Sequence, residues 1–255
     1  MKDAFASLEG NGVSVFYYDI IDSTNSQAKR ACLSGVSAPA LFVADAQSGG
    51  RGRMGRSFFS PPKTGIYLTV LIDAPCSAEN SLKLTSAAAV AVRRAIFQVT
   101  GISTKIKWVN DIYLGDRKIA GILAESFPSP CSRKRCVALG VGINLFTEDF
   151  PEELKSIAGS LMNSSGFSEA IRPALAARTA QLLFELLADP DQPSIMEEYR
   201  EHSAVLGKRV RFYENGIAAE GIALSIDNNG ALLAQKDNGE TVALASGEIS
   251  LRLSE

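Results

Sequence analysis

The chain has 255 residues, of which 46% are hydrophobic, so it can bury a substantial core as one large domain or two unequal ones. Its 26 Lys and Arg residues are balanced by 28 Asp and Glu residues, whereas domains that bind nucleic acid usually carry a basic excess. No apolar run approaches the ~20 residues that a membrane span requires, and the N-terminus lacks the apolar stretch of a secretory signal. We therefore expect a cytoplasmic protein that binds neither nucleic acid nor a membrane.

The first part of the chain is predicted to contain short strands and two helices. Runs of β-branched and aromatic residues predict strands at residues 13–20, 40–47 and 65–73. Thr24 and Gln27 form a T-x-x-Q capping box, which predicts that a short helix begins after the first strand. The alanine-rich stretch 81–101 has apolar residues at helical spacing and ends in glycine, so it predicts a long helix.

The middle of the chain is predicted to form hairpins followed by helices. Strands are expected at residues 104–108, 111–114, 118–126 and 136–145, with a tight turn at Gly115-Asp116. Helices are expected at 168–188 and at about 193–203. Because hairpins and helices are mixed and no β-α-β unit repeats, we expect an α+β fold, with a mixed β-sheet that has helices on one side.

The sequence changes in character after Leu206. Short runs typical of strands follow, within residues 208–214, 218–226, 231–235, 240–246 and 248–253. Turn signals separate several of them, including Asn215-Gly216 and Asn238-Gly239. This spacing predicts a small SH3-like β-barrel. We therefore predict two domains, residues 1–204 and residues 205–255.

The stretch GGRGRMGRSFFSPP (residues 49–62, the arginine loop) alternates glycines with Arg51, Arg53 and Arg56. Glycine lets backbone N–H groups approach a ligand, and arginine offers planar forks that match carboxylate and phosphate. The loop fits the dinucleotide-binding G-x-G-x-x-G pattern and resembles a P-loop, but both need a helix directly after the glycines. The Pro61-Pro62 pair disfavours that helix. A small anionic ligand also suits this slightly acidic chain better than RNA does.

The cysteines and the single histidine form no recognisable metal or nucleophile motif. Cys32, Cys76, Cys131 and Cys136 are scattered, and the C-x4-C pair has no second pair. We therefore expect reduced, incidental thiols. Any serine or cysteine nucleophile would depend on His202 alone, which is expected to be a solvated residue at a helix end.

Four segments, in this order, resemble the catalytic core of the bacterial biotin–protein ligase family: DSTNSQA (22–28), QSGGRGRMGRSFFSP (47–61), KWVNDIYLGDRKIAGILAE (107–125) and GVGINL (140–145). The closing GALL…GEISLR resembles the C-terminal barrel of that family. Only residues 1–21 precede DSTN, so the resemblance is to the short form, biotin–[acetyl-CoA-carboxylase] ligase, which lacks an N-terminal DNA-binding domain.

The resemblance implies an ATP-dependent ligase, with residues 1–204 as its catalytic domain. Members of the family condense biotin with ATP to biotinyl-5′-adenylate and release pyrophosphate. They then transfer biotin to a lysine of a carrier, such as the biotin carboxyl carrier protein of acetyl-CoA carboxylase. The arginine loop would hold the two anions together and shield the mixed anhydride from water. Mg²⁺ is expected near Asp111 and the ATP phosphates, and a homodimer through a sheet edge is expected from the family.

The same resemblance assigns the candidate site residues. Lys118, Arg53 and Arg51 would be catalytic, with Lys118 contacting the biotin carboxylate and the α-phosphate. Biotin would also be bound by Ser23, Thr24, Asn25, Gln47, Gly50, Gly52, Gly121, Leu123, Gly140 and Gly142. The nucleotide would be bound by Arg53, Arg56, Phe58, Lys107, Trp108, Asn110, Asp111 and Asn144, and Arg56 would also anchor the loop.

Several of these residues also have a purely structural interpretation. Ser23 and Thr24 suit helix capping, and an Asn-Asp pair such as 110–111 suits a turn. Lys118 could be an ordinary charged residue beside a hairpin turn, and the glycines could simply allow close packing.

Two positions depart from the family pattern. Val109 stands where the family usually has proline, so the turn on the nucleotide side is expected to be looser, with no reacting group lost. Phe58 stands where a tryptophan often follows the arginine loop. Phenylalanine keeps the apolar face but lacks the indole donor.

Three alternatives stay open at this point. A lipoate–protein ligase would share the architecture but would lack the G-R-G-R-x-G-R run. An inactive biotin-binding homologue is disfavoured by the intact Lys118 and arginine loop. A transcription factor of the family would need a helix-turn-helix, for which residues 1–21 are too few.

Overall fold

The computed structural model describes residues 1–74, 78–129, 135–163, 168, 170–214, 217–245 and 250–251. Cys76, Cys131 and the predicted turn at Asn215-Gly216 lie outside the described residues. Within the described ranges, no helix is both long enough and apolar enough to cross a membrane.

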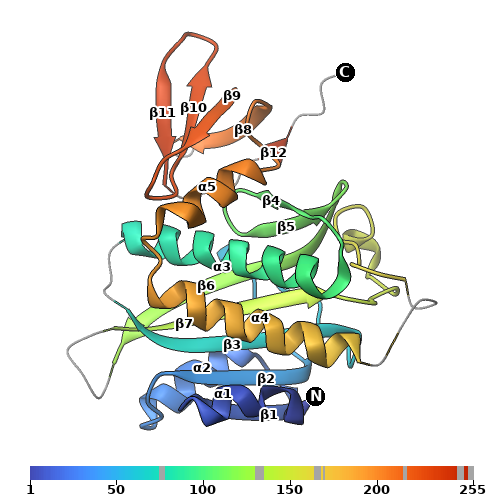
Figure 1. Cartoon of the computed structure of the whole chain (residues 1–255). Coiled ribbons are helices and arrows are strands. Elements are labelled where there is room, and N and C mark those ends of the chain that lie inside the picture. Colours follow the sequence, from blue (N-terminus) through green and yellow to red (C-terminus); the bar gives the residue numbers. More distant parts are fainter. Residues whose placement is uncertain are drawn as a thin grey trace.

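A seven-stranded mixed sheet forms the larger part of the molecule (Figure 1). Its strands, in order across the sheet, are β1 (Ser14–Ile21), β2 (Ala40–Gln47), β3 (Gly65–Ala74), β7 (Arg135–Asn144), β6 (Arg117–Pro128), β5 (Asp111–Leu114) and β4 (Lys105–Lys107). β1 and β2 run parallel, and the other neighbouring pairs run antiparallel. The predicted mixed sheet is therefore confirmed.

Helices pack against both faces of this sheet. Among the described residues, the helical segments are η1 (Lys2–Phe5), α1 (Ala6–Gly10), α2 (Thr24–Leu33), η2 (Arg53–Gly55, in the arginine loop), α3 (Ala78–Thr100), η3 (Glu152–Leu154), α4 (Ile171–Ala188) and α5 (Pro193–Glu201). The long helices α3 and α4 lie side by side over the face that carries Leu41 and Val43 (Figure 1). Because side chains alternate along a strand, Phe42 faces the other way and packs with α2. The long helices thus lie on one side, as predicted, and α2 occupies the other.

The predicted capping box at Thr24 is wrong by one residue. Ser23 is the N-cap, because its backbone is extended and its Oγ accepts a hydrogen bond from the Ser26 backbone N–H at 3.4 Å. The carbonyl of Ser23 accepts the first helical bond, from Gln27 N at 2.9 Å. The Gln27 side chain instead donates to the Tyr18 hydroxyl at 3.2 Å. Thr24 is therefore the first helical residue, and its hydroxyl can contact other elements.

α2 and β7 approach each other closely at Gly140. A Cβ at this position would lie 2.1 Å from Asn25 Oδ1, well inside van der Waals contact. Asn25 is held in place because its Nδ2 donates to the Leu123 carbonyl at 3.2 Å and to Glu125 Oε2 at 3.0 Å. Position 140 therefore has to be glycine for the first turn of α2 to sit against the sheet.

The C-terminal strands form a second, antiparallel sheet. Their order is β11 (Thr241–Leu244), β10 (Leu232–Lys236), β9 (Ile217–Ile226), β8 (Arg209–Glu214) and β12 (Ser250–Leu251). This agrees with the predicted small β unit. Ala204 N donates to the Ile106 carbonyl, whereas Gly207 N donates to the Ala223 carbonyl, each at 2.8 Å. The chain leaves one sheet and joins the other between these residues. This point is consistent with the division into residues 1–204 and 205–255, which stays a prediction.

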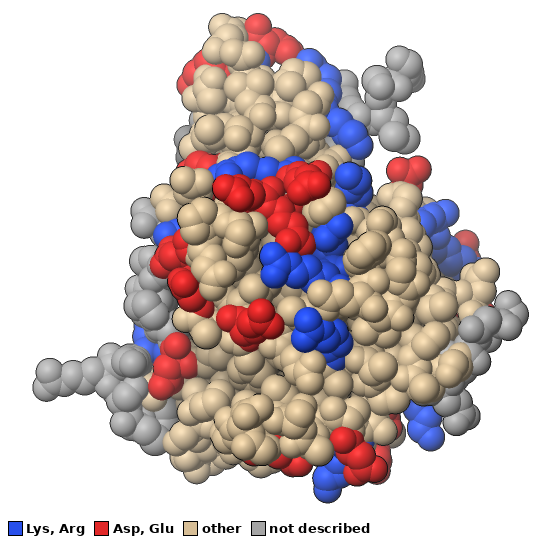
Figure 2. Space-filling model, viewed as in Figure 1, with Lys and Arg blue, Asp and Glu red and all other residues tan. Residues whose placement is uncertain are grey.

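The second sheet lies beyond α5 at one end of the helical layer (Figure 1). Arg200 of α5 donates to the Ile226 carbonyl at 2.5 Å. Acidic and basic side chains gather next to one another beneath this sheet on the face drawn in Figure 2. Between α3 and α5, Glu198 pairs with Arg93 at 3.0 Å and with Arg94 at 2.7 Å. The two helices under the second sheet are thus joined by charge as well as by packing.

We expect Gly140→Ala to lower the free energy of unfolding by about 1–3 kcal/mol, because the added methyl group must displace Asn25 or push β7 away from α2. Denaturant unfolding measures this change. Gly10→Ala is the matched control, because a Cβ there would meet nothing within 4 Å. An unchanged unfolding midpoint for Gly140→Ala would contradict the close contact.

Candidate active site

A cavity of about 480 Å³ opens where the first turn of α2, the arginine loop and strands β5, β6 and β7 meet. Every residue predicted to bind biotin or nucleotide lines this cavity except Gly50, which is a buried residue of the arginine loop. A Cβ at Gly50 would lie 2.3 Å from the Phe58 carbonyl oxygen, so this glycine serves the packing of the loop. The structure thus brings the predicted residues together, and their individual roles stay predictions.

One end of the cavity is a cluster of neutral hydrogen-bonding groups. Gln47 Oε1 accepts a hydrogen bond from the Thr24 backbone N–H at 2.8 Å and lies 3.1 Å from the Thr24 hydroxyl. Thr69, which is fully buried on β3, lies 2.8 Å from the Thr24 hydroxyl and donates to Asn25 Oδ1 at 2.7 Å. The oxygen and nitrogen of the Asn25 side-chain amide cannot exchange places, since the nitrogen donates to the Leu123 carbonyl. This end therefore suits an uncharged ring that both donates and accepts hydrogen bonds.

The floor of the cavity is built from glycines on β6 and β7. A Cβ at Gly142 would lie 2.5 Å from the Phe58 ring, and a Cβ at Gly121 would lie 3.2 Å from Lys118 Nζ. Phe58 also meets the buried Tyr67 edge-on, with 6.5 Å between the ring centroids. The glycines thus make room for protein side chains that border the cavity. Phe58 keeps the apolar contact expected of an aromatic residue at its position.

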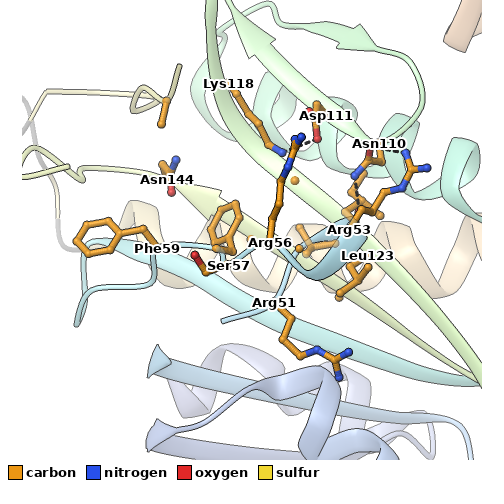
Figure 3. Close-up of a pocket in the computed structure, with 18 of the residues that line it drawn as sticks. Arg51, Arg53, Arg56, Ser57, Phe59, Asn110, Asp111, Lys118, Leu123 and Asn144 are labelled. Carbon is orange, nitrogen blue, oxygen red and sulfur yellow. Dashed lines mark hydrogen bonds and ion pairs between the residues drawn. The ribbon is translucent and has the colours of Figure 1, made fainter. Parts of the chain in front are cut away.

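The other end of the cavity carries positive charge. Lys118 Nζ lies 2.6 Å from Asp111 Oδ1, and Arg53 donates to Asn110 Oδ1 at 3.1 Å. Arg56 extends toward Asp111 (Figure 3). Asn110 is fixed by its own Nδ2, which donates to the Ile122 carbonyl at 2.8 Å. Three cations thus gather around Asn110 and Asp111, where the only carboxylate among the described lining residues is Asp111, and this leaves the end attractive to phosphate or carboxylate groups.

Arg51 points away from the other two arginines of the loop (Figure 3). Its guanidinium pairs with Glu125 Oε1 at 2.9 Å and lies 3.5 Å from the Ser26 hydroxyl. The family resemblance implied that Arg51 is catalytic and that Arg56 anchors the loop. In this structure, Arg51 pairs with Glu125 outside the cationic end, whereas Arg56 extends toward that end.

Lys107 and Tyr113 form a pair beside the cationic end. Lys107 Nζ lies 5.1 Å from the centre of the Tyr113 ring and 3.3 Å from its hydroxyl oxygen. Burial raises the pKa of Tyr113 to about 12, and the nearby Asp111 carboxylate adds to the shift. The phenol therefore stays neutral at physiological pH and can both donate and accept hydrogen bonds.

The segment 108–111 is held by hydrogen bonds from residues that do not line the cavity. The Trp108–Val109 peptide bond is cis. Trp108 Nε1 donates to the Gly230 carbonyl of the second sheet at 2.9 Å, and the Val109 carbonyl accepts a bond from the Tyr199 hydroxyl at 3.0 Å. Burial raises the pKa of Tyr199, so its hydroxyl remains a donor. Although valine replaces the proline usual in the family, the backbone at Val109 is bonded and its side chain is buried.

A segment after β7 covers the cationic end. Its residues Phe150, Leu154, Ile157 and Ala158 line the cavity. It is joined to the backbone of Lys118, because Lys118 N donates to the Ile157 carbonyl at 2.9 Å. Beside it, Asn144 Oδ1 is buried and has no hydrogen-bond partner within the described ranges. An unsatisfied buried acceptor is costly, so Asn144 is suited to meet a donor on a ligand.

The cysteines take no part in the cavity where the structure describes them. Cys32 of α2 and Cys136 of β7 are buried thiols whose sulfur atoms lie 3.1 Å apart. Cys136, the second cysteine of the C-x4-C stretch, thus contacts Cys32, a residue that this spacing does not indicate. Within the described ranges, no group of three or more His, Cys, Asp or Glu side chains could form a metal site.

Four parts of the site were not among the predicted site residues: Thr69, Tyr113, Glu125 and the covering segment 150–158. Thr69 is a single polar residue inside the apolar run GIYLTVLI, and this is a signal that could have identified it. Tyr113 lies within the family-like segment 107–125, on the short strand β5 that begins at Asp111. The covering segment gives no signal, because its apolar residues have no regular spacing.

Comparison with known proteins agrees with this geometry. The model of the Biotin/lipoate A/B protein ligase family matches residues 17–144, and the model of the Biotin protein ligase C terminal domain matches residues 205–252. The bifunctional ligase/repressor BirA of Bacillus spizizenii is 34% identical over 235 residues, which cover 89% of this chain and 71% of that protein. The biotin–[acetyl-CoA-carboxylase] ligase of Mycobacterium tuberculosis is 33% identical over 238 residues, covering 89% and 85% respectively.

A solved structure extends the agreement to the whole fold. The biotin protein ligase from Aquifex aeolicus in complex with biotin and ATP superposes with a TM-score of 0.75 and 28% sequence identity, over 94% of this chain and 99% of that one. The two family models together match both sheets and the motifs that line the cavity. On these grounds, the chain belongs to the biotin protein ligase family.

Proposed function

We propose that this protein is an ATP-dependent biotin–protein ligase, which forms biotinyl-5′-AMP and transfers biotin to a specific lysine of a biotin carboxyl carrier protein. The observation that carries the proposal is one cavity with a neutral hydrogen-bonding cluster at one end and a cationic cluster at the other. Biotin has a neutral ureido ring and a carboxylate tail, and the adenylate adds a phosphate to that tail. The order of chemical groups in the ligand therefore matches their order along the cavity.

In the first step, a biotin carboxylate oxygen attacks the α-phosphorus of ATP and the bond to pyrophosphate breaks. Both reactants are anions, so cations must hold them together and stabilise the charge that shifts toward the leaving group. We assign Lys118 to the carboxylate and the α-phosphate. Arg53 and Arg56 come from the flexible loop and are assigned to the phosphates.

In the second step, the amine of a carrier lysine attacks the acyl carbon. The bond from that carbon to the phosphate oxygen breaks, AMP leaves with the electron pair, and the lysine nitrogen loses a proton to become an amide. The mixed anhydride has to be kept from water until then. The arginine loop on one side and the segment containing Phe150 and Ile157 on the other are placed to exclude water.

Asp111 is suited to hold Mg²⁺ beside the phosphates. Magnesium in such sites is usually bound by one or two carboxylates together with substrate phosphates, so a single protein carboxylate fits this chemistry. Asp111 is the carboxylate among the described residues lining the cavity. Bound Mg²⁺ would offset phosphate charge, while Lys118 and Arg53 act as described.

The biotin carboxyl carrier protein of acetyl-CoA carboxylase is the partner we propose, since relatives in Mycobacterium tuberculosis and Paracoccus denitrificans are named biotin–[acetyl-CoA-carboxylase] ligases. We also propose a homodimer through the edge strand β1, which exposes 69% of Ile20. A purely monomeric boundary in sedimentation velocity would contradict the dimer. The need for ATP supports a cytoplasmic site of action, and the near-neutral net charge supports our expectation of no nucleic-acid partner.

Exchange of labelled pyrophosphate into ATP is the experiment that tests the activity. We expect exchange that depends on biotin, because formation of biotinyl-5′-AMP is reversible and releases pyrophosphate. Lipoate is the parallel substrate and is expected to be inactive. Exchange with lipoate instead would assign the chain to lipoate attachment, and no exchange with either substrate would favour an inactive biotin-binding homologue.

Lys118→Ala is expected to slow adenylate formation on the order of 10²–10³-fold, as for the loss of one transition-state donor. The pyrophosphate exchange rate at saturating biotin and ATP measures this effect. Lys208→Ala is the control, because it removes an exposed lysine of the C-terminal part. Undiminished exchange in folded Lys118→Ala protein would remove Lys118 from its assigned role.

Arg53→Gly is expected to release biotinyl-5′-AMP before transfer, because the loop loses its contact with Asn110. Released adenylate reacts with any nearby amine, so lysines of a bystander protein should become biotinylated. Arg53→Lys keeps the charge but loses the planar fork, so it should give an intermediate effect. Strictly carrier-dependent labelling by Arg53→Gly would contradict this assignment.

A further inference from the structure

Glu125 on β6 contacts two functional segments at once. Its Oε1 lies 2.9 Å from Arg51 of the arginine loop, and its Oε2 accepts a hydrogen bond from Asn25 of α2 at 3.0 Å. Glu125 is the last residue of the family-like segment 107–125, but it was not among the predicted site residues. One carboxylate therefore joins the arginine loop to the first turn of the helix that borders the neutral end.

The hydrogen bonds continue from Asn25 through the neutral end and return to the loop. Asn25 contacts Thr69, which contacts Thr24, and Thr24 donates to Gln47. Gln47 Nε2 then donates to Ser60 Oγ at 2.9 Å, and Ser60 Oγ donates to the Phe58 carbonyl at 2.9 Å. The network thus starts at Arg51 and ends at Phe58, which are both in the arginine loop.

The ion pair to Arg51 is the weakest connection in this network. The side chains of Arg51 and Glu125 are 48% and 31% exposed, respectively. Partly exposed ion pairs contribute little to stability, so this one can hold the loop without locking it. By contrast, Asn25 and Thr69 are buried and cannot move without leaving polar groups unsatisfied.

We propose that Glu125 is a positioning residue that anchors the arginine loop through Arg51. The proposal rests on the ligase function only for its effect on the adenylate. By holding Arg51 next to α2, Glu125 orients the loop so that Arg53 and Arg56 face the cationic end. Glu125 also couples the loop to Asn25, so the ring-binding end and the closing loop share one network.

The substitution Glu125→Gln separates the two contacts. A glutamine oxygen can still accept the hydrogen bond from Asn25, whereas its amide group donates and gives Arg51 no negative partner. The amides of Gly52 and Phe58 report on the loop, because they donate to the Arg56 and Gly50 carbonyls at 2.7 Å and 2.9 Å. We expect their hydrogen exchange in the ligand-free protein to become about twofold to fivefold faster, as for the loss of one partly exposed ion pair. Exchange of α2 amides should not change.

Two comparisons make the test specific. Glu240→Gln is the matched control, since it removes a Glu–Lys pair at 3.2 Å in the second sheet, and it should leave loop exchange unchanged. Arg51→Gln should accelerate exchange as Glu125→Gln does, and the double variant should add nothing further, because both changes break the same pair. Unchanged loop exchange in Glu125→Gln, additive effects in the double variant, or equal acceleration throughout α2 would overturn the proposal.

The effect on the adenylate is measured in the same variants. Escape of biotinyl-5′-AMP from Glu125→Gln should be faster by about the same factor as loop exchange, with little change in its rate of formation. Unchanged escape would overturn the positioning role. If the unmodified chain forms no adenylate, the proposed function fails, and hydrogen exchange of the loop still decides whether Glu125 anchors it.

Discussion

The contact between Asn25 and Gly140 is the constraint on which the rest of the site depends. The 2.1 Å that would separate a Cβ at 140 from Asn25 means that α2 sits as close to β7 as a side chain allows. Only at this distance can Asn25 reach both Leu123 and Thr69. If α2 lay farther from the sheet by the width of a methyl group, several buried polar groups would lose their partners, at about 1–3 kcal/mol each.

The two ends of the cavity are built in different ways, and the difference suits their tasks. The neutral end consists of buried groups on a helix and two strands, so a ligand lacking the matching donors and acceptors would leave them unpaired. The cationic end is built largely from a loop and a turn, with partly exposed charges such as Lys118 and Asp111. Partners in such pairs can be exchanged at low cost. Under the proposed function, the buried neutral end is therefore suited to selecting the ligand, and the cationic end is suited to stabilising charge.

The sequence was informative where the signal is local. Strand and helix patterns located the sheet and the long helices, and the four contiguous motifs contain every lining residue outside the covering segment among the described residues. It was not informative where a partner comes from far along the chain. Ser23 and Thr24 are both good caps, and only the observed backbone conformation, extended at Ser23, decides between them. The partner of Arg51 is Glu125, which lies in a different motif far along the chain, and the contact between the thiols of Cys32 and Cys136 is likewise not indicated by their spacing.

Trp108 shows why the second sheet is part of the site. Its indole borders the cavity, and its N–H donates to the Gly230 carbonyl between β9 and β10. Asn110 and Asp111 follow in the chain, so displacing the second sheet would strand a buried donor and shift the residues that orient Arg53 and Lys118. A buried donor left without an acceptor costs more free energy than the hydrogen bond itself contributes. The C-terminal sheet therefore restrains the cationic end of the cavity from behind, although none of the residues that the structure describes in it lines the cavity.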